Sequence, residues 1–208
     1  MARRGDPGYA SSWPYVPGLE VAGTVLETGP GVTGLWPGQQ VAAFTRGGGL
    51  AEIADADAAL TAAVPDGVAL PAAAAAPLML STAWLLLAEV TRARRGESLL
   101  MHSAGGGIGS AVAQIAKQFG MGVSIGTASR PEKAAGALRN GWQHVFVRDQ
   151  RLAQSVRAAV GGGIDVVLDP TGTALLDLDL ELAAPGARIV LFGNPPAGSP
   201  GRCRRWAR

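Results

Sequence analysis

The sequence is poor in residues that bind metals or form covalent cross-links. Its 208 residues include one cysteine, Cys203, and two histidines, His102 and His144. A disulfide needs two cysteines, and a structural zinc site usually takes four cysteine or histidine ligands. One chain therefore cannot build a disulfide framework or a Cys/His zinc site, which favours a reducing compartment such as the cytoplasm.

Charged residues are also scarce, at 16%, and aromatic residues reach only 5%, whereas 48% of residues are apolar. This balance predicts a folded globular chain and argues against disorder. The formal charge of +2 comes from six arginines near the two ends, and without them 12 basic residues remain against 16 acidic ones. We therefore expect no nucleic-acid partner.

No long apolar run is free of interruption. The longest, residues 69–90, contains Pro71 and Pro77 and carries Glu89. No basic-then-apolar signal segment opens the chain. We interpret the run as buried helix, expect no membrane contact and expect a cytoplasmic location.

The pattern along the chain changes at about residue 70. Before this point, short β-type segments separated by glycine-rich turns predict a small β-barrel or sandwich, with strands within 20–27, 36–45, 48–56 and 60–67. A helix is predicted next, over residues 71–94, and Gly96 marks its exit.

From Ser98 onward, predicted strands and helices alternate. The strands are at 99–103, 123–127, 144–147, 164–169 and 188–192, and the helices at 108–119, 131–140, 152–160 and 174–183. Such alternation predicts an α/β fold with a doubly wound parallel sheet of the Rossmann type, here of about five strands.

The clearest functional signal is the segment LLMHSAGGGIGSAVAQIAK at 99–117. An apolar strand, a glycine-rich loop and a helix with small apolar residues follow one another directly. Such glycines allow a tight turn, close approach of the backbone to a pyrophosphate and close helix–strand packing. The phosphates would bind amides at the helix N-terminus. The predicted dinucleotide-binding residues are Ser103, Ala104, Gly105, Gly106, Gly107, Ile108 and Gly109; the alternative is a connection that binds nothing.

The end of the second strand indicates which dinucleotide binds. NAD sites usually place an acidic residue there for the ribose 2′-hydroxyl. This sequence instead has Ser129 and Arg130, with Lys133 one helical turn later. These residues suit a 2′-phosphate and favour NADPH. The alternative is a solvated helix start in which Glu132 pairs with either cation.

Several segments together resemble a known family. They are PYVPGLEVAGTV, GVTGLWPGQQVAAF, STAWLLL, HSAGGGIGSAVAQIAK, IGTASRPEK, DVVLDPTG and LFGN, spread over residues 5–196. In this order they resemble the zinc-independent NADPH quinone oxidoreductases of the medium-chain dehydrogenase/reductase superfamily. The resemblance implies a partial GroES-like lobe at 1–75, a Rossmann domain at 76–196 and an irregular tail at 197–208.

The resemblance also implies further residues near the cofactor. Thr82 would approach the nicotinamide ribose or phosphate, and Arg148 stands where the family often has a tyrosine and could reach the phosphate. The residues that would border the nicotinamide are Asp169, Phe192, Gly193 and Asn194.

Each of these assignments has a structural alternative. Thr82 could bond a carbonyl of its own helix, Asp169 could cap a helix, and Gly193 with Asn194 could be a simple turn. The resemblance also places Tyr9 near the family's active-site tyrosine, which makes it a weak catalytic candidate.

Metal chemistry is not expected. The zinc alcohol dehydrogenases of this superfamily read Gly-His-Glu where this sequence reads Gly18-Leu19-Glu20, and leucine cannot bind zinc. The resemblance therefore implies hydride transfer from NADPH to a quinone or another α,β-unsaturated carbonyl compound. His102, inside the first predicted Rossmann strand, is interpreted as a hydrogen-bonded core residue, the alternative being an acid.

Three expectations concern the chain as a whole. It looks truncated at both ends relative to the family, which a frame shift or a partial reading frame would explain. The family also implies a homodimer formed through the last Rossmann strand, at 188–192. The alternatives to an active quinone reductase are a non-catalytic NADPH-binding or structural protein and an enoylreductase module of a polyketide synthase.

Overall fold

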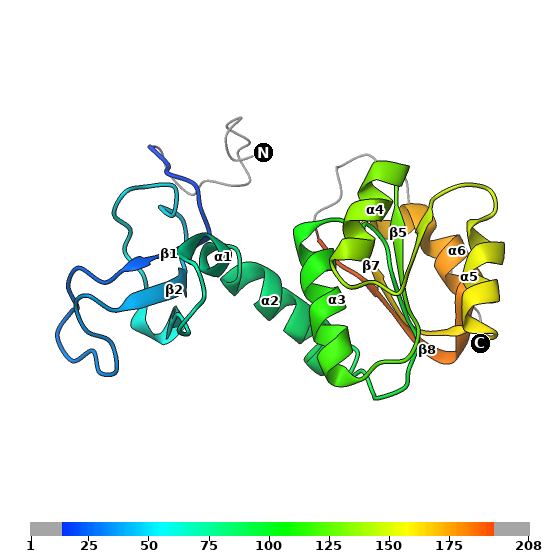
Figure 1. Cartoon of the computed structure of the whole chain (residues 1–208), viewed down its shortest axis with the longest axis horizontal. Coiled ribbons are helices and arrows are strands. Elements are labelled where there is room, and N and C mark those ends of the chain that lie inside the picture. The colour runs from blue at the N-terminus through cyan, green and yellow to red at the C-terminus, as the bar shows by residue number, and fades with distance from the viewer. Residues whose placement is uncertain (1–13, 194–208) are drawn as a thin grey trace. The chain divides into compact units, whose positions relative to one another are not determined.

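The structure is a computed structural model, and it describes residues 14–193. The chain divides into two compact units, the first ending at Ser81 and the second beginning at Thr82 (Figure 1). Three residues named above, Tyr9, Asn194 and Cys203, lie outside the described residues.

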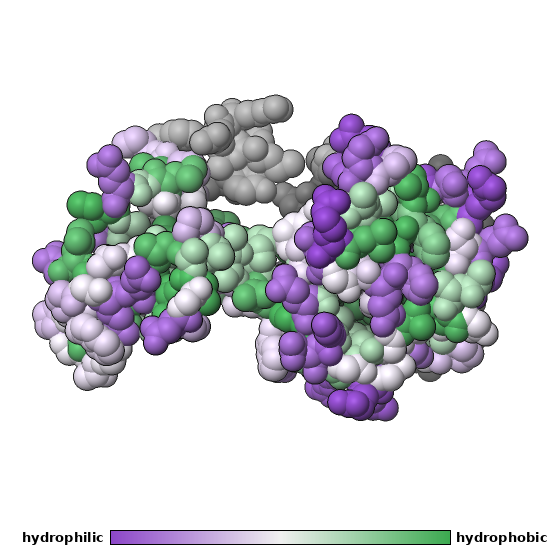
Figure 2. All heavy atoms as spheres, in the orientation of Figure 1, coloured by the Kyte–Doolittle hydropathy of each residue, from purple (hydrophilic) through white to green (hydrophobic). Residues whose placement is uncertain are grey.

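The first unit contains a small antiparallel sheet. Strands β1 (Glu20–Thr24), β2 (Gln40–Phe44) and β3 (Thr61–Ala63) pair in chain order, and the 3₁₀ helix η2 (Ala58–Leu60) precedes β3. Figure 2 shows extensive apolar surface on this unit, where Leu26, Trp36 and Ile53 are more than half exposed.

The strand expected at 48–56 is wrong, because these residues form turns and bends. Gly48 N–H donates to the carbonyl oxygen of Val16, and Leu50 N–H to that of Pro17. Gly18 has a φ of +114°, and a Cβ there would lie 2.5 Å from Leu50 N. The glycines thus let two turns pack backbone to backbone, and the donors that a strand would offer its neighbour are used within this contact.

The helix expected at 71–94 is also corrected. The segment forms α1 (Leu70–Ala74), α2 (Pro77–Trp84) and a π-helical stretch η3 (Leu85–Val90). Pro77 lacks an N–H and disfavours helical geometry in the residue before it, so the chain breaks between α1 and α2. Thr91 ends the segment, since its Oγ–H donates to the carbonyl oxygens of Leu86 and Leu87.

The second unit is the predicted α/β fold. Its five parallel strands lie in the order β6-β5-β4-β7-β8. They are β4 (Leu99–Met101), β5 (Ser124–Ala128), β6 (His144–Val147), β7 (Ile164–Asp169) and β8 (Ala183–Leu191).

Helices cover both faces of this sheet (Figure 1). Helices α3 (Gly107–Phe119) and α4 (Pro131–Arg139) lie on one side, and α5 (Leu152–Val160) and α6 (Leu176–Leu182) on the other. The 3₁₀ helix η4 (Gly172–Leu175) leads into α6. The doubly wound fold class is therefore confirmed.

The core lies between the sheet and these helices. Leu100, Ile125 and Val167, from three adjacent strands, are fully buried together with Val156 of α5. No helix within residues 14–193 is long and apolar enough to cross a membrane.

Candidate functional site

The site is set by the edge of the sheet at which the strands end. Because all five strands are parallel, their carboxyl ends meet at one edge. The direction of winding reverses between β4 and β7, whose following helices cover opposite faces (Figure 1). Ligands of doubly wound sheets bind in the crevice at such a switch point.

The glycine-rich loop leads from β4 into α3 at this edge. Gly106 is the N-cap of α3, and no side chain caps the helix. Gly106 N–H itself is used in the turn, donating to the carbonyl oxygen of Ser103 at 3.0 Å. The amides of the first turn of α3 have no acceptor within the helix, and no acidic residue occupies that turn. The loop therefore presents free donors to an anion.

Close packing explains small residues in this loop and in the neighbouring strand β5. A Cβ at Gly109 would lie 2.4 Å from the carbonyl oxygen of Ala104. A Cβ at Gly126 in β5 would lie 2.4 Å from the Cβ of Ala104. Trp142, which is buried, donates its Nε1–H to the carbonyl oxygen of Gly109 at 3.1 Å. The beginning of α3 is thus held directly against the sheet.

The backbone at Ser103 is strained, with a φ of +58°. A non-glycine residue in the left-handed region costs about 1 kcal/mol or more. The turn begins here, so β4 ends at Met101 rather than continuing to Ser103 as expected.

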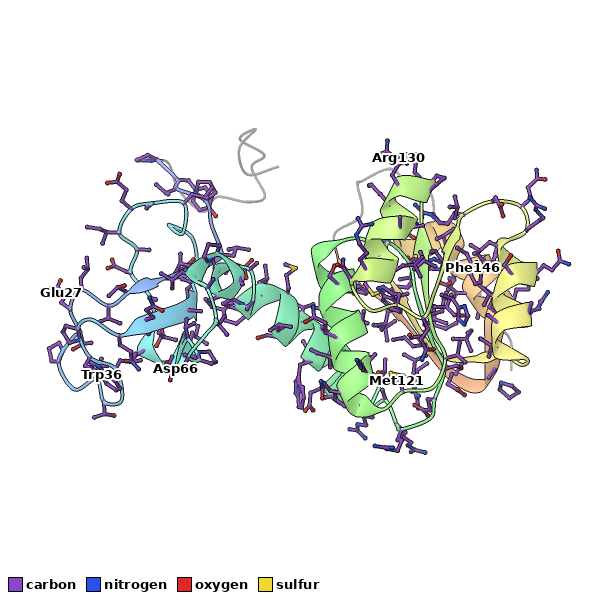
Figure 3. All side chains as sticks on the ribbon, in the orientation of Figure 1. Glu27, Trp36, Asp66, Met121, Arg130 and Phe146 are labelled. Carbon is purple, nitrogen blue, oxygen red and sulfur yellow. The ribbon has the colours of Figure 1, made fainter. Side chains whose placement is uncertain are left out.

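The predicted basic residues lie beside the glycine loop. A Cβ at Gly105 would lie 3.2 Å from the carbonyl oxygen of Lys133, so the loop touches the first turn of α4. Ser129, Arg130 and Lys133 are all exposed, and Figure 3 shows Arg130 projecting from the beginning of α4. Arg148 follows β6 at the same edge, because its N–H donates to the carbonyl oxygen of Ala128 at 2.9 Å.

The alternative in which Glu132 neutralises these cations finds no support. Among the residues that the structure describes, Glu132 forms no ion pair with Arg130 or Lys133. Both cations remain available to a phosphate.

The residues expected near a nicotinamide also lie at this edge. Phe192 N–H donates to the backbone oxygen of Asp169 at 3.0 Å, and a Cβ at Gly193 would lie 3.7 Å from the carbonyl oxygen of Pro170. The Asp169 side chain is fully buried, and its Oδ1 accepts from the N–H and Oγ–H of Thr171. It shapes a turn instead of capping a helix, which corrects that alternative.

Two predicted residues are not placed with this group. Thr82 lies in α2, half-buried, and forms no side-chain hydrogen bond within residues 14–193. Tyr9 lies outside the described residues. Leu19 is half-exposed, and the neighbouring Glu20 accepts a hydrogen bond from Leu78 N–H at the start of α2.

A buried polar cluster beneath the edge was only partly anticipated. His102 is fully buried, with Nδ1 2.8 Å from Thr127 Oγ1 and Nε2 2.8 Å from Asp179 Oδ1. It follows β4, where its interpretation as a hydrogen-bonded core residue fits. Asp179 and Trp142 were missed. Asp179 lies in the run LDLDLEL, in which alternating acidic residues are typical of a solvated surface, although here burial raises its pKa.

Within the described part of the chain, no group of three histidine, cysteine, aspartate or glutamate side chains is placed to hold a metal ion.

Two family models match the sequence. One, described as the alcohol dehydrogenase GroES-like domain, matches residues 1–66, and the other, described as zinc-binding dehydrogenase, matches residues 107–205. Together they account for most of both structural units.

The individual relatives include quinone oxidoreductases and polyketide synthases. Rat quinone oxidoreductase is 34% identical over 194 residues, covering 92% of this chain and 59% of the rat protein. The pikromycin polyketide synthase component PikAII of Streptomyces venezuelae is 39% identical over 184 residues, covering 87% of this chain and 5% of that protein.

Solved structures agree with these matches. A mycobacterial protein crystallised with NADPH superposes with a TM-score of 0.80 at 35% identity, covering 90% of this chain and 59% of that one. The chain thus spans little more than half the length of the rat and mycobacterial proteins.

Proposed function

Because the chain belongs to the medium-chain dehydrogenase/reductase superfamily, we propose that it binds NADPH and forms part of an oxidoreductase that passes hydride to a quinone or another α,β-unsaturated carbonyl compound. One observation carries the cofactor assignment: the glycine loop touches the first turn of α4 at Lys133. Free amides for a pyrophosphate and cations for a 2′-phosphate therefore stand side by side.

The residues present fit NADPH along the whole edge. The amides at the start of α3, from Gly107 to Gly109, would hold the pyrophosphate, with Ser103, Ala104 and Gly106 shaping the loop. On one side, Ser129, Arg130, Lys133 and Arg148 would contact the adenosine phosphate. On the other, Asp169, Phe192 and Gly193 would border the nicotinamide. The position of Thr82 near the ribose rests on the resemblance alone.

The bound cofactor would supply the hydride, and the chain would hold the dinucleotide in a fixed orientation. Fixed amides and cations would orient the dinucleotide across the sheet edge, and the closely packed strand ends beneath it would exclude water. We propose that no metal takes part, since Leu19 has no atom that could ligate zinc. Hydride transfer then depends on orientation rather than on Lewis-acid activation.

The cofactor assignment is tested by calorimetry with NADPH and NADH. Replacing both Arg130 and Lys133 by alanine should weaken NADPH binding about 10–100-fold, because charge-assisted hydrogen bonds to the 2′-phosphate are lost. NADH affinity should change less than about twofold. The matched control is Arg139→Ala, an exposed cation in the last turn of the same helix, which should leave both affinities unchanged. Equal affinities of the wild-type chain for NADPH and NADH would contradict the assignment.

Turnover requires a separate measurement. NADPH oxidation in the presence of 1,2-naphthoquinone should proceed if the chain is a reductase. NADPH binding without oxidation would instead favour a non-catalytic NADPH-binding protein.

A second candidate is an enoylreductase module of a polyketide synthase. It is favoured by the 39% identity to PikAII, which exceeds the identity to the rat quinone oxidoreductase. Reduction of an α,β-unsaturated acyl thioester, with no turnover of the naphthoquinone, would decide for this candidate.

We further propose a cytoplasmic location and a homodimer formed along β8. Strand β8 is an edge strand of the five-stranded sheet, so one side of its backbone is open to pairing. Sedimentation of the wild-type chain and of an Ile189→Pro variant would test the dimer, which the proline should abolish because it removes a ladder donor.

A further inference from the structure

A continuous chain of buried side chains crosses the switch point of the sheet. It starts at Thr127 of β5, passes through His102 after β4 and Asp179 of α6, and reaches Asp169 at the end of β7. All four residues are fully buried. The chain therefore links the ends of three adjacent strands directly beneath the edge at which the dinucleotide is proposed to bind.

Within residues 14–193, each of the two carboxyl groups in this chain has one oxygen with a donor and one without. Asp179 Oδ1 is paired with His102, and Asp169 Oδ1 with Thr171. The remaining oxygens, Oδ2 of Asp169 and Oδ2 of Asp179, are buried and have no donor among the described residues, and the side chain of Asp169 interacts with that of Asp179. Ionised carboxylates only accept hydrogen bonds, so two facing carboxylates would leave both oxygens unsatisfied and repelling.

One added proton removes this conflict. We propose that Asp169 and Asp179 share a proton between their Oδ2 atoms, and that the hydrogen-bonded chain so completed positions the Asp169–Gly172 turn for the nicotinamide half of NADPH. The pair then carries one negative charge, and an O–H···O⁻ bond replaces two orphaned acceptors. The positioning part of this inference rests on the proposed function, whereas the shared proton does not.

The position of the turn depends on this pair through Asp169. Its Oδ1 accepts from both the N–H and the Oγ–H of Thr171, and its backbone oxygen accepts from Phe192 N–H. An Asp169 side chain that is held at Oδ2 cannot rotate without breaking the turn. The shared proton therefore fixes the ends of β7 and β8 together.

The surroundings of Asp179 supply no competing donor. The titratable groups that face it are His102, which follows β4, and Asp169, which ends β7. The His102 Nε2–H donates to Asp179 Oδ1, and we assign Nδ1 as acceptor of the Thr127 hydroxyl. Burial and the neighbouring Asp169 both raise the pKa of Asp179, with the hydrogen bond from His102 opposing them.

The shared proton is tested on the full chain without cofactor. Wild type should show the infrared carbonyl stretch of a protonated carboxylic acid at about pH 7, shifted in D₂O, and Asp179→Asn should abolish it. Asparagine keeps an acceptor for His102 and offers a permanent donor to Asp169. The matched control is Asp177→Asn, an exposed carboxylate on the same helix, which should retain the band. No such band in wild type would overturn the shared proton.

Stability against pH provides a second readout. The folded state holds a proton that the unfolded chain releases, so wild-type stability should be highest below the unfolded-state pKa of Asp179 and should fall as the pH rises through its raised folded-state pKa. Asp179→Asn should flatten this slope and Asp177→Asn should keep it. The double variant Asp169→Asn/Asp179→Asn places two amide donors face to face and should be less stable than Asp179→Asn alone; equal stability would contradict the pairing.

NADPH affinity tests the positioning role over the pH range in which the infrared band of the shared proton disappears. Wild-type affinity should fall several-fold as the shared proton is lost, and Asp179→Asn should keep an affinity that is high and independent of pH. Asp179→Ala, if it folds, should bind about tenfold more weakly. A wild-type affinity independent of pH would overturn the positioning role. No binding by wild type would overturn the proposed function together with that role, while the infrared band would still decide the shared proton.

Discussion

Replacing Gly109 by alanine probes the packing that holds the glycine loop. The added Cβ would lie 2.4 Å from the carbonyl oxygen of Ala104 and 2.8 Å from its Cα. Both are backbone atoms, so no side-chain rotation can make room. Relief to an ordinary contact of about 3.4 Å requires α3 to move away from the sheet by about 1 Å.

That displacement has a calculable cost. Overpacking of this kind costs about 1–3 kcal/mol. The hydrogen bond from Trp142 to Gly109, now 3.1 Å, would lengthen beyond bonding distance and leave the buried Nε1–H of Trp142 unpaired, costing about 1–3 kcal/mol more. The better helix propensity of alanine returns about 1 kcal/mol. We therefore expect Gly109→Ala to lose about 1–5 kcal/mol of unfolding free energy, out of a typical total of about 5–15 kcal/mol.

Chemical denaturation measures this loss, with Gly162→Ala as the matched control. Gly162 has an ordinary φ, and no atom lies within 4 Å of a Cβ added there, so this change should alter stability by less than about 0.5 kcal/mol. NADPH affinity should also fall about tenfold in Gly109→Ala, because the displaced amides no longer align with the pyrophosphate. If the two variants unfold within about 0.5 kcal/mol of each other, the packing argument is wrong.

Two further changes address the surroundings of this loop, and a third addresses the opposite end of β4. Ser103→Val should lower the unfolding free energy by about 1–2 kcal/mol in thermal or chemical denaturation, since a β-branched residue tolerates positive φ poorly, while Ser103→Gly should not lower it. Trp142→Phe should cost about 0.5–1.5 kcal/mol in the same assay, because the hydrogen bond from the indole to the Gly109 carbonyl is lost while the helical bond to that carbonyl remains. Ser98 donates from its N–H and its Oγ–H to Asp165 and holds the pKa of that carboxyl below its usual value. The lowered pKa contributes stability above the unfolded-state pKa, and this stability is lost as the pH falls through the folded-state pKa. Ser98→Ala should therefore lower the unfolding free energy at neutral pH and reduce the further decrease on acidification. Denaturation from about pH 7 to about pH 3 measures both effects.

Strong periodic signals made the Rossmann unit predictable. The strands at 144–147 and 164–169 and the helix at 152–160 have the predicted bounds, because apolar runs there are flanked by glycine or polar turns. Strand β8 starts five residues earlier than predicted, at Ala183, and it contains Pro185 and Gly186, which disfavour most strands. An edge strand needs donors on one side only, so it tolerates a proline that a central strand would not.

The first unit was less predictable because its glycines act over long sequence separations. Gly18 and Gly49 pack against each other across about thirty residues, and the β-type pattern at 48–56 gives no sign of that contact. In the helical region, Pro77 was read as tolerated within one helix. The structure shows it instead at the first residue of a new helix, a position that suits its missing N–H.

At the site, sequence spacing found the residues that would face a cofactor but not those that hold them. The spacing of glycines in a motif indicates where a ligand can approach the main chain closely, as at Gly106. A supporting residue such as Trp142 or Asp179 is brought in by the fold, 33 residues from Gly109 in one case and 77 residues from His102 in the other. The one available signal was the buried-strand position of His102, because a buried imidazole must find a partner for each ring nitrogen.

The same logic explains why small residues and buried charges occur together beneath this edge. Glycine and alanine at 104, 109 and 126 let α3 press directly on β4 and β5, which leaves no room for water to solvate polar groups there. A polar group below the loop must then be satisfied by another side chain, as His102 is by Thr127 and Asp179. Close packing therefore makes the position of the loop depend on a complete set of hydrogen bonds. Loss of the proposed proton between Asp169 and Asp179 would then displace the backbone that faces the cofactor.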